Sequence, residues 1–401
     1  MVCVVKEKFL KHRNINSTNS ENFLEGVITM KLKNLKKKLT AFVTAATFGA
    51  SLIFSAPTVE ALSLNDAINI GGAIIVGNEQ KRQLNKQIDL INNTEEGRQA
   101  LFSKFKEKYG VNTDAAMNER LTRIMSILSK AVAEVDPTIN DKPYLYFVSN
   151  QETLNAGCSL GHIMMVNAGT MIQVKTDDQI AAIIGHEMGH GQKDHVAKGA
   201  RRQINEQMLA QIGVSAAGGT TLAALAGTIA LNHSLAHGDR KQETEADNLA
   251  WDYILHTNYN IGAPAAVMQK FVELEQRTGK RSEILNFFQP SDHPDSKKRR
   301  ENYTKKLFEY SGKHATVDAK KGVVTVNGKN FLTAAATDTL SAGERNYFVL
   351  GNLAAAYHNG HAKADAYVKD GTVYLGAQPI ITPVNGDESA EVLAKRLNEI
   401  K

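Results

Sequence analysis

Residues 181–195, AAIIGHEMGHGQKDH, place three histidines and a glutamate within and just after a run of apolar and small side chains. Upstream, Thr176 and Gln179 have the spacing of a helix capping box, and Asp177 and Asp178 suit the positive end of a helix dipole. Apolar residues then recur every three or four positions, which predicts an α-helix. Imidazole and carboxylate groups are costly to bury alone, so the fold must supply this segment with a polar partner.

A metal ion is the partner that this spacing favours. His186 and His190 are four residues apart, so on a helix both imidazoles can point at one position, as a tetrahedral zinc ion requires. Glu187 lies one step further round the helix, where it can reach a water on the metal without binding the ion itself. The alternative is a helix with two hydrogen-bonded histidines and no metal.

A second acidic segment can complete the site, because a catalytic zinc keeps three protein ligands and one open position. Residues 240–253, RKQETEADNLAWDY, predict a helix with Glu243 and Asp247 one turn apart. Small Ala246 and Ala250 beside them would let this helix approach the first one closely. We therefore expect Glu243 to be the third ligand and Asp247 to accept a hydrogen bond from a ligating histidine. The alternative for these acids is a solvated helix face.

With HEMGH followed by ETEAD, the chain resembles the HtpX and CAAX prenyl protease family of zinc metallopeptidases, gluzincins that carry H-E-x-x-H and E-x-x-A-D. The resemblance covers about residues 65–310 and is closest to the soluble periplasmic, BepA-like branch. It implies a mainly helical zincin-like domain that binds one Zn²⁺ per chain through His186, His190 and Glu243, with Glu187 as the catalytic residue.

Residues 154–171, LNAGCSLGHIMMVNAGTM, resemble the stretch and the edge strand that line the cleft of this family. The resemblance implies that a substrate strand would lie beside four residues, namely Asn155, Ile163, Met164 and Met165. Gly157 and Cys158 depart from the apolar pair that is more usual there.

Residues 291–300, SDHPDSKKRR, resemble the H-P motif and the following arginine of the family. In the soluble branch this histidine can approach the zinc, either to hold a latent state or to contact substrate. The resemblance therefore makes His293, Arg299 and Arg240 candidates for binding the oxyanion or for latching the site, and the sequence does not choose among them.

These residues predict a metalloendopeptidase that acts on misfolded or envelope proteins. The metal would polarise the scissile carbonyl, and Glu187 would carry a proton from the attacking water to the leaving amine. Two alternatives stay open. One is a latent, chaperone-like zinc-binding envelope factor in which His293 occupies the open position, and the other is a membrane-embedded protease of the same family.

The first 61 residues have the pattern of a secretory leader. A basic stretch, MKLKNLKKK, begins at Met30, and a 16-residue apolar run and small residues up to Ala61 follow it. We expect translation to start at Met30 and cleavage to follow Ala61, which would send the protein to the periplasm or the extracellular space. A retained membrane anchor is the alternative, although 16 residues are few against the roughly 20 that a spanning helix needs.

Charge and cysteine content further limit the classes of protein to which this chain can belong. The leader has nine Lys and Arg residues against four Asp and Glu, which leaves 38 of each sign in residues 62–401. The folded part therefore has no electrostatic footprint for nucleic acid. Beyond the leader, Cys158 is the single cysteine, so no intramolecular disulfide forms there.

Residues 212–232 carry no charge, and their Gly, Ala and Thr content favours a buried helix over a membrane span. A peripheral membrane contact of this segment stays open. From residue 315 the pattern changes to two hairpins, each followed by a helix, and six residues recur 49 positions apart, from Gly322 and Gly371 onward. We therefore predict an α+β fold with a metallopeptidase domain over residues 62–311. A small α+β domain over residues 315–401 would follow, with an internal duplication and a site for an envelope partner.

Overall fold

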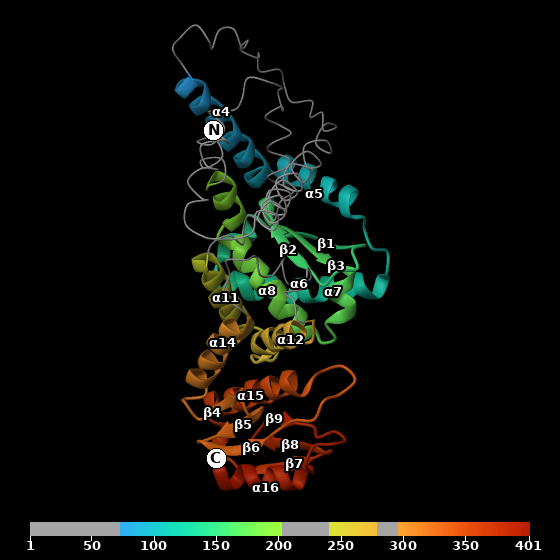
Figure 1. The fold of residues 1–401 in the computed structure, drawn as a ribbon, viewed down its shortest axis with the longest axis vertical. Helices are drawn as coiled ribbons and strands as arrows, with labels where there is room; N and C mark the ends of the chain where they lie inside the picture. Colours follow the sequence, from blue (N-terminus) through green and yellow to red (C-terminus); the bar gives the residue numbers. More distant parts are fainter. Residues whose placement is uncertain (1–72, 203–239, 279–295) are drawn as a thin grey trace, which may run out of the picture.

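The structure, a computed structural model, describes residues 73–202, 240–278 and 296–401. The leader, residues 212–232 and His293 lie outside these ranges, so the predictions made for them stay predictions. Among the described helices, none is both long enough and apolar enough to cross a bilayer. Figure 1 shows the N-terminal helices at the top, a three-stranded sheet and its helices in the middle, and residues 315–401 at the bottom.

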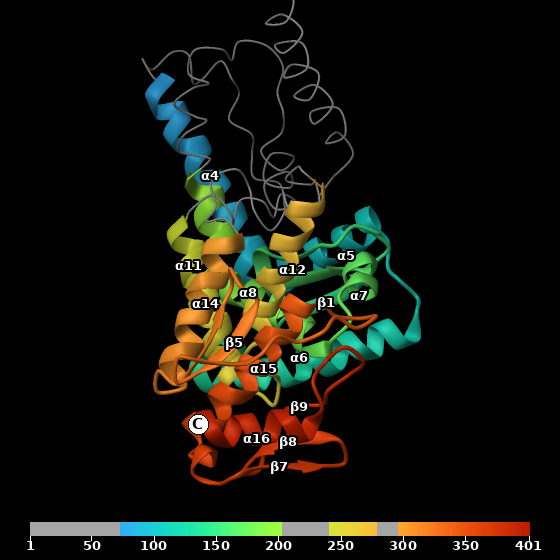
Figure 2. The ribbon, with the colours of Figure 1, turned by 60° about the horizontal axis from the view of Figure 1, so that its bottom comes forward.

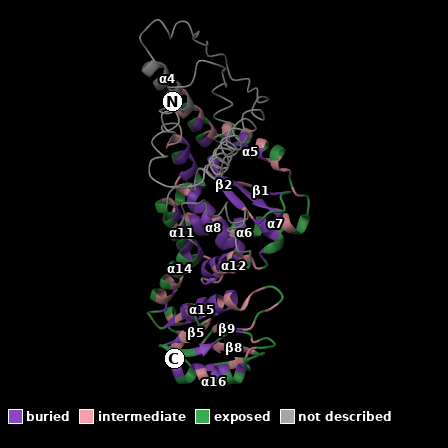
Figure 3. Cartoon of the chain, viewed as in Figure 1, coloured by how far each residue is buried: buried purple, intermediate pink, exposed green. Residues whose placement is uncertain are grey.

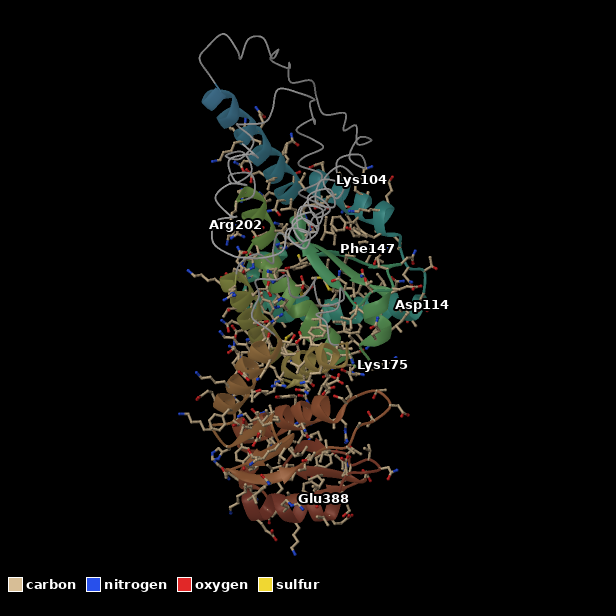
Figure 4. The ribbon with its side chains drawn as sticks, viewed as in Figure 1. Lys104, Asp114, Phe147, Lys175, Arg202 and Glu388 are labelled. Carbon is tan, nitrogen blue, oxygen red and sulfur yellow. The ribbon has the colours of Figure 1, made fainter. Side chains whose placement is uncertain are left out.

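Three helices open the described part of the chain, as the sequence predicts. They are α4 (Ala73–Asn93), α5 (Glu95–Tyr109) and α6 (Ala115–Val135). Thr94 caps α5 by accepting the Gly97 N–H, and Asp114, labelled in Figure 4, caps α6 by accepting the Met117 N–H. The amphipathic α6 packs its apolar face against the rest of the domain, and six of its apolar residues are buried.

The sheet contains β1 (Leu145–Ser149), β2 (Ala156–Ser159) and β3 (Ile163–Asn167) in the order β1-β3-β2. β1 and β3 are the two predicted strands, and they pair in parallel. The connection between them contains β2, which pairs antiparallel with β3. All four residues of β2 are buried, so the strand has no alternation of polar and apolar side chains by which to recognise it.

This strand order corrects the expected position of the substrate edge. β3 has a hydrogen-bonded neighbour on each side, so its backbone cannot accept a further strand along Ile163, Met164 and Met165. The edge of the sheet on this side is β2.

Helix α8 (Asp177–Gln192) lies at the centre of the middle layer and packs against β2, α6, α11 (Arg240–Leu255) and α12 (Ala263–Thr278). Figure 3 shows α8 almost wholly buried, and every residue from Gln179 to Gly191 is buried. The Thr176 hydroxyl caps α8 by accepting the Gln179 N–H, which confirms the predicted start of the helix. Helices α7 (Ala168–Gln173) and α14 (Ser296–Tyr310) complete this layer.

Residues 315–401 form two similar units. The first has β4 (Ala315–Asp318), β5 (Val323–Val326), β6 (Lys329–Leu332) and α15 (Ala342–His358). The second has β7 (Ala366–Lys369), β8 (Thr372–Leu375), β9 (Gln378–Ile381) and α16 (Ala390–Ile400). The strands lie between α15 and α16 in Figure 1, and Figure 2 shows β7 and β8 next to α16.

The 49-residue offset in the sequence coincides with this repeat. Val324 pairs with Leu332 beside an irregularity in the ladder, and Val373 pairs with Ile381 beside an irregularity at the same place. Each unit is antiparallel throughout, with the strand order of a meander.

The C-terminal unit packs directly on the helical layer. α15 contacts α12 and α14, and one apolar core runs from α6 through to α16. Polar contacts cross this junction as well, because the Gln179 amide donates to the buried Glu344 carboxylate at 2.7 Å. The first turn of α8 is therefore fixed by a residue of α15.

Candidate metal centre

Helices α8 and α11 approach closely where they carry the predicted ligands. A β-carbon added at Gly189 would lie 3.0 Å from the Ala246 Cα, inside normal contact distance. At Gly185 an added β-carbon would lie 3.9 Å from the Ala250 Cα, which is an ordinary contact. The small residues thus lie at the helix crossing, as the sequence predicts for Ala246 and Ala250.

Three side chains converge at this crossing. The ligand atoms of His186, His190 and Glu243 all lie within 4.8 Å of one another, and the three residues are buried. His190 Nε2 lies 3.1 Å from His186 Nε2 and 3.1 Å from a Glu243 oxygen, and His186 Nε2 lies 3.5 Å from the second Glu243 oxygen. Two imidazole nitrogens and one carboxylate oxygen form a donor set that suits zinc.

Asp247 lies one turn beyond Glu243 and binds the far side of His186. Its Oδ1 lies 3.0 Å from His186 Nδ1, and it also accepts from the Tyr303 hydroxyl at 2.9 Å. Arg299 of α14 donates to both Asp247 oxygens, from Nη2 at 2.6 Å and from Nε at 2.9 Å. The carboxylate therefore orients His186 so that its Nε2 faces the cluster.

Neighbouring charges and hydrogen bonds shift the pKa values of His186 and Asp247. Burial and the Arg299 charge lower the pKa of His186, but hydrogen bonds to Asp247 and Glu243 outweigh them and raise it to about 9. Burial raises the pKa of Asp247, but Arg299 and His186 outweigh it and hold this pKa far below its usual range. Asp247 is accordingly an ionised carboxylate near neutral pH.

Glu187 lies between the cluster and the sheet edge. Its Oε2 accepts the Cys158 N–H at 3.2 Å, and the whole residue is buried. This N–H belongs to β2 and points away from β3, so the edge strand faces α8 at the position of Glu187. The Cys158 thiol is buried, and burial together with Glu187 raises its pKa far above the usual range, so it is no nucleophile.

The structure separates the remaining candidates. Arg299 lies at the cluster, with Nη1 3.9 Å from a Glu243 oxygen, but it is buried and paired with Asp247. Arg240 lies on the exposed stripe of α11, where it lines a surface depression with Thr244. The role of Arg240 at the oxyanion or as a latch therefore stays a prediction.

Asn155 lies immediately before β2, at the edge that a substrate can reach. Its N–H donates to the Thr170 hydroxyl at 2.6 Å, and its side-chain carbonyl oxygen is buried with no hydrogen-bond partner among the described residues. Of the four residues predicted to lie beside the substrate, Asn155 is the one that lies next to the edge strand β2.

Sequence reasoning missed two side chains next to the cluster. Tyr303 follows Arg299 by one helical turn, so the arginine that resembles the family motif could have pointed to it. His195 is the second, and its Nδ1 lies 2.9 Å from His190 Nδ1. No local pattern signals this second contact.

The geometry can hold a metal, position a carboxylate beside it and present a strand edge. Residues 117–306, from α6 into α14, match the family described as peptidase family M48. This range includes both helices of the cluster.

The chain is also similar to individual proteins of Escherichia coli (strain K12) and Shigella flexneri. Metalloprotease LoiP of E. coli is 26% identical over 189 residues, which make up 47% of this chain and 71% of LoiP. The beta-barrel assembly-enhancing proteases of E. coli and S. flexneri are 21% identical over 263 residues, or 63% of this chain. This match spans about half, 49%, of those two proteins.

Proposed function

Residues 117–306 form a peptidase family M48 domain, and from this premise we propose that the chain is an exported zinc-dependent metalloendopeptidase. One observation carries the proposal, namely the convergence of His186, His190 and Glu243 within 4.8 Å in the protein interior. Glu187, on the same helix as both histidines, supplies the carboxylate that peptide hydrolysis needs.

The three converging residues fit a zinc ion in number, atom type and burial. When bound there, zinc would polarise the scissile carbonyl and lower the pKa of a coordinated water. Asp247 would keep His186 Nε2 directed at the ion, and α14 would support Asp247 through Arg299.

Glu187 has the position of a general base. Its carboxylate is buried between the three ligands and β2, so it can take a proton from the attacking water and return it to the leaving amide nitrogen. The Cys158 N–H at 3.2 Å holds this carboxylate in place.

We place the substrate on the edge of β2. An extended polypeptide would add to this edge on the Asn155 side of Cys158, because the outward Cys158 N–H is bound to Glu187. Asn155, with its buried side-chain oxygen, would receive a substrate N–H at the start of the strand. His293 stays our candidate for the oxyanion or for a latch.

The relatives suggest where this activity is used. One is named a beta-barrel assembly-enhancing protease, so we propose misfolded or envelope proteins as substrates. The leader would export the chain to the periplasm or beyond. We propose residues 62–311 as the peptidase domain and residues 315–401 as a second, duplicated domain that binds an envelope partner. A peripheral membrane contact of the chain is a separate proposal.

The test is metal content and cleavage of casein by residues 62–401, compared between wild type and Glu187→Gln. Glu119→Gln, which removes an exposed carboxylate of α6, is the matched control. We expect one zinc per chain in all three proteins, and cleavage in wild type and Glu119→Gln alone. Removal of His293 by His293→Ala would raise turnover if this residue latches the site.

Two results would overturn the proposal. One is cleavage by Glu187→Gln at the wild-type rate, since a general base contributes roughly 10²–10⁴-fold. The other is a folded wild-type chain that takes up no zinc at micromolar metal.

A further inference from the structure

A third imidazole extends the cluster to the protein surface. His195 Nδ1 lies 2.9 Å from His190 Nδ1, and His195 Nε2 lies 3.1 Å from Glu245 Oε2. His195 is fully buried, whereas the Glu245 side chain is 48% exposed. The three side chains thus form one continuous row from the metal ligand to solvent.

A break in the helix places His195 in this row. On a straight α-helix, a residue five positions on from a ligand points away from it. Here α8 ends at Gln192, and Asp194 adopts a left-handed backbone with a φ of 50°. The Asp194 carboxylate accepts from Asn92 at 3.0 Å and from Lys142 at 3.3 Å, which holds the turn. The turn directs the His195 ring back toward the cluster.

The Glu245 carboxylate, at the solvent end of this row, determines which atom donates and which accepts in each hydrogen bond. A carboxylate only accepts hydrogen bonds, so His195 Nε2 must carry the hydrogen that reaches Glu245. The 2.9 Å contact between the two Nδ1 atoms needs one donor and one acceptor, and an imidazole whose single hydrogen is on Nε2 accepts at Nδ1. His190 Nδ1 must then be the donor, which leaves the lone pair of His190 Nε2 facing Glu243.

His186, the other histidine of the cluster, is also oriented by a carboxylate, but without an intervening imidazole. His186 Nδ1 lies 3.0 Å from Asp247 directly, and Asp247 is buried and paired with Arg299. Each metal-facing imidazole is therefore backed by a carboxylate, one through direct contact and one through a second imidazole.

We propose that His195 and Glu245 are positioning residues that hold His190 in the form whose Nε2 binds the metal. The proposal rests on the metal site proposed above. It assigns a function to His195, which follows helix α8, and to Glu245 of helix α11. His195 contributes more than Glu245, because its contact with the ligand is direct and excluded from water.

The experiment measures zinc affinity by competition with a chromophoric chelator, using the full chain and four variants. His195→Leu removes the acceptor, whereas His195→Gln can restore it through its side-chain carbonyl. Glu245→Ala removes the outer carboxylate at an exposed position. His256→Leu is the matched control, because His256 and Glu134 form a pair of the same 3.1 Å length at the far end of α11.

A second readout detects the hydrogens themselves. In protein labelled with ¹⁵N-histidine, two-bond ¹H–¹⁵N spectra distinguish protonated from unprotonated ring nitrogens. We expect His195 to carry its hydrogen on Nε2 and to have a bare Nδ1, both with zinc and without it. This measurement does not depend on peptidase activity.

We expect His195→Leu to weaken zinc binding about 10- to 100-fold, as loss of a group behind a metal ligand commonly does. Glu245→Ala should weaken it less, and His195→Gln and His256→Leu should stay near wild type. Unchanged affinity in His195→Leu, equal losses in His195→Leu and His195→Gln, or a hydrogen on His195 Nδ1 would each overturn the proposal. If wild type takes up no zinc, the proposed function fails, and the nitrogen spectra of the metal-free chain still decide the orientation of the row.

Discussion

Arg299 binds Asp247 through two parallel hydrogen bonds in the protein interior, from Nη2 to Oδ1 at 2.6 Å and from Nε to Oδ2 at 2.9 Å. The same Asp247 oxygen Oδ1 lies 3.0 Å from His186 Nδ1. Helix α14 is therefore connected to a metal-facing imidazole of α8 through a residue of α11. Arg299 supports the site from behind and does not face the substrate edge.

Replacing Arg299 should destabilise the folded protein. Arg299→Met leaves the Asp247 carboxylate buried beside His186 without its main countercharge, and loss of one partner of a buried ion pair costs about 3–5 kcal/mol. We expect the free energy of unfolding in urea to fall by that amount.

The neighbouring Arg300 provides the comparison. It is buried to a similar extent, but its Nη1 donates to the neutral Gln269 side chain at 2.6 Å. Arg300→Met should cost only about 1–2 kcal/mol, because no buried charge is left behind. Equal losses in the two variants would show that Arg299 contributes by packing alone.

The sequence predicted the site where its geometry is local. The four-residue spacing of His186 and His190 requires only a helix, and helix α8 begins at its predicted capping residue. Small residues at the helix crossing were predictable for the same reason, because Ala246 lies one turn from the ligands on the same helix. The fold class also followed from local patterns.

The remaining contacts depend on how distant segments meet. Arg299 and Asp247 are 52 residues apart, so no spacing rule joins them. β2 was missed because four buried residues give no alternation, and without β2 the central strand β3 was taken for an edge. The left-handed Asp194 was missed as well, and it alone reverses the expected direction of His195.

Gly189 should tolerate no side chain. In Gly189→Ala the new methyl group would meet the Ala246 Cα and carbonyl oxygen at 3.0 and 3.1 Å, which are backbone atoms that cannot rotate away. The helices must separate, so we expect a loss of about 1–3 kcal/mol in stability and weaker zinc binding, because Glu243 moves with α11. Chemical denaturation and chelator competition measure both effects.

Gly185→Ala is the matched control one turn earlier. Its methyl group would lie 3.9 Å from the Ala250 Cα, so it fits, and alanine favours a helix over glycine by up to about 1 kcal/mol. This variant should be as stable as wild type or more so. A loss of zinc affinity in Gly185→Ala equal to that in Gly189→Ala would contradict the role given to the close approach.

The stability of the metal-free protein should fall between pH 6.5 and pH 4 because of His162. Burial and the nearby Lys142 charge lower the pKa of this imidazole to about 4, whereas an unfolded histidine titrates near 6.5. Within this interval the unfolded chain binds the extra proton, so the free energy of unfolding decreases as the pH falls, by about 3 kcal/mol in total. Urea denaturation at several pH values, with a chelator present, measures this slope.

His162→Asn should flatten the slope. Asparagine tolerates the left-handed backbone of this residue, whose φ is 54°, and it carries no titrating group. His256→Asn is the control, because the His256 side chain is 43% exposed. A slope in His162→Asn as steep as in wild type would assign the pH dependence to other groups.

Glu344 should couple the C-terminal unit to helix α8, which carries His186 and His190. Its Oε1 accepts from the Gln179 amide at 2.7 Å and lies 3.4 Å from Lys270 Nζ, while its Oε2 accepts the Ser341 N–H that caps α15. Both oxygens thus face donors in a buried position. Glu344→Gln turns one acceptor into a donor, so either the Gln179 contact or the cap must fail, at a cost of about 2 kcal/mol.

Glu388→Gln tests whether the effect is specific to the junction. Glu388, labelled in Figure 4, lies just before α16 of the C-terminal unit, but its side chain is 49% exposed and pairs with Arg396 at the surface. An exposed pair contributes less than about 1 kcal/mol, so Glu388→Gln should unfold like wild type. Because Gln179 lies in the first turn of the helix that carries His186, Glu344→Gln should also lower casein cleavage, and Glu388→Gln should not. Loss of stability in Glu344→Gln with unchanged cleavage would mean that the C-terminal unit supports the fold without influencing the site.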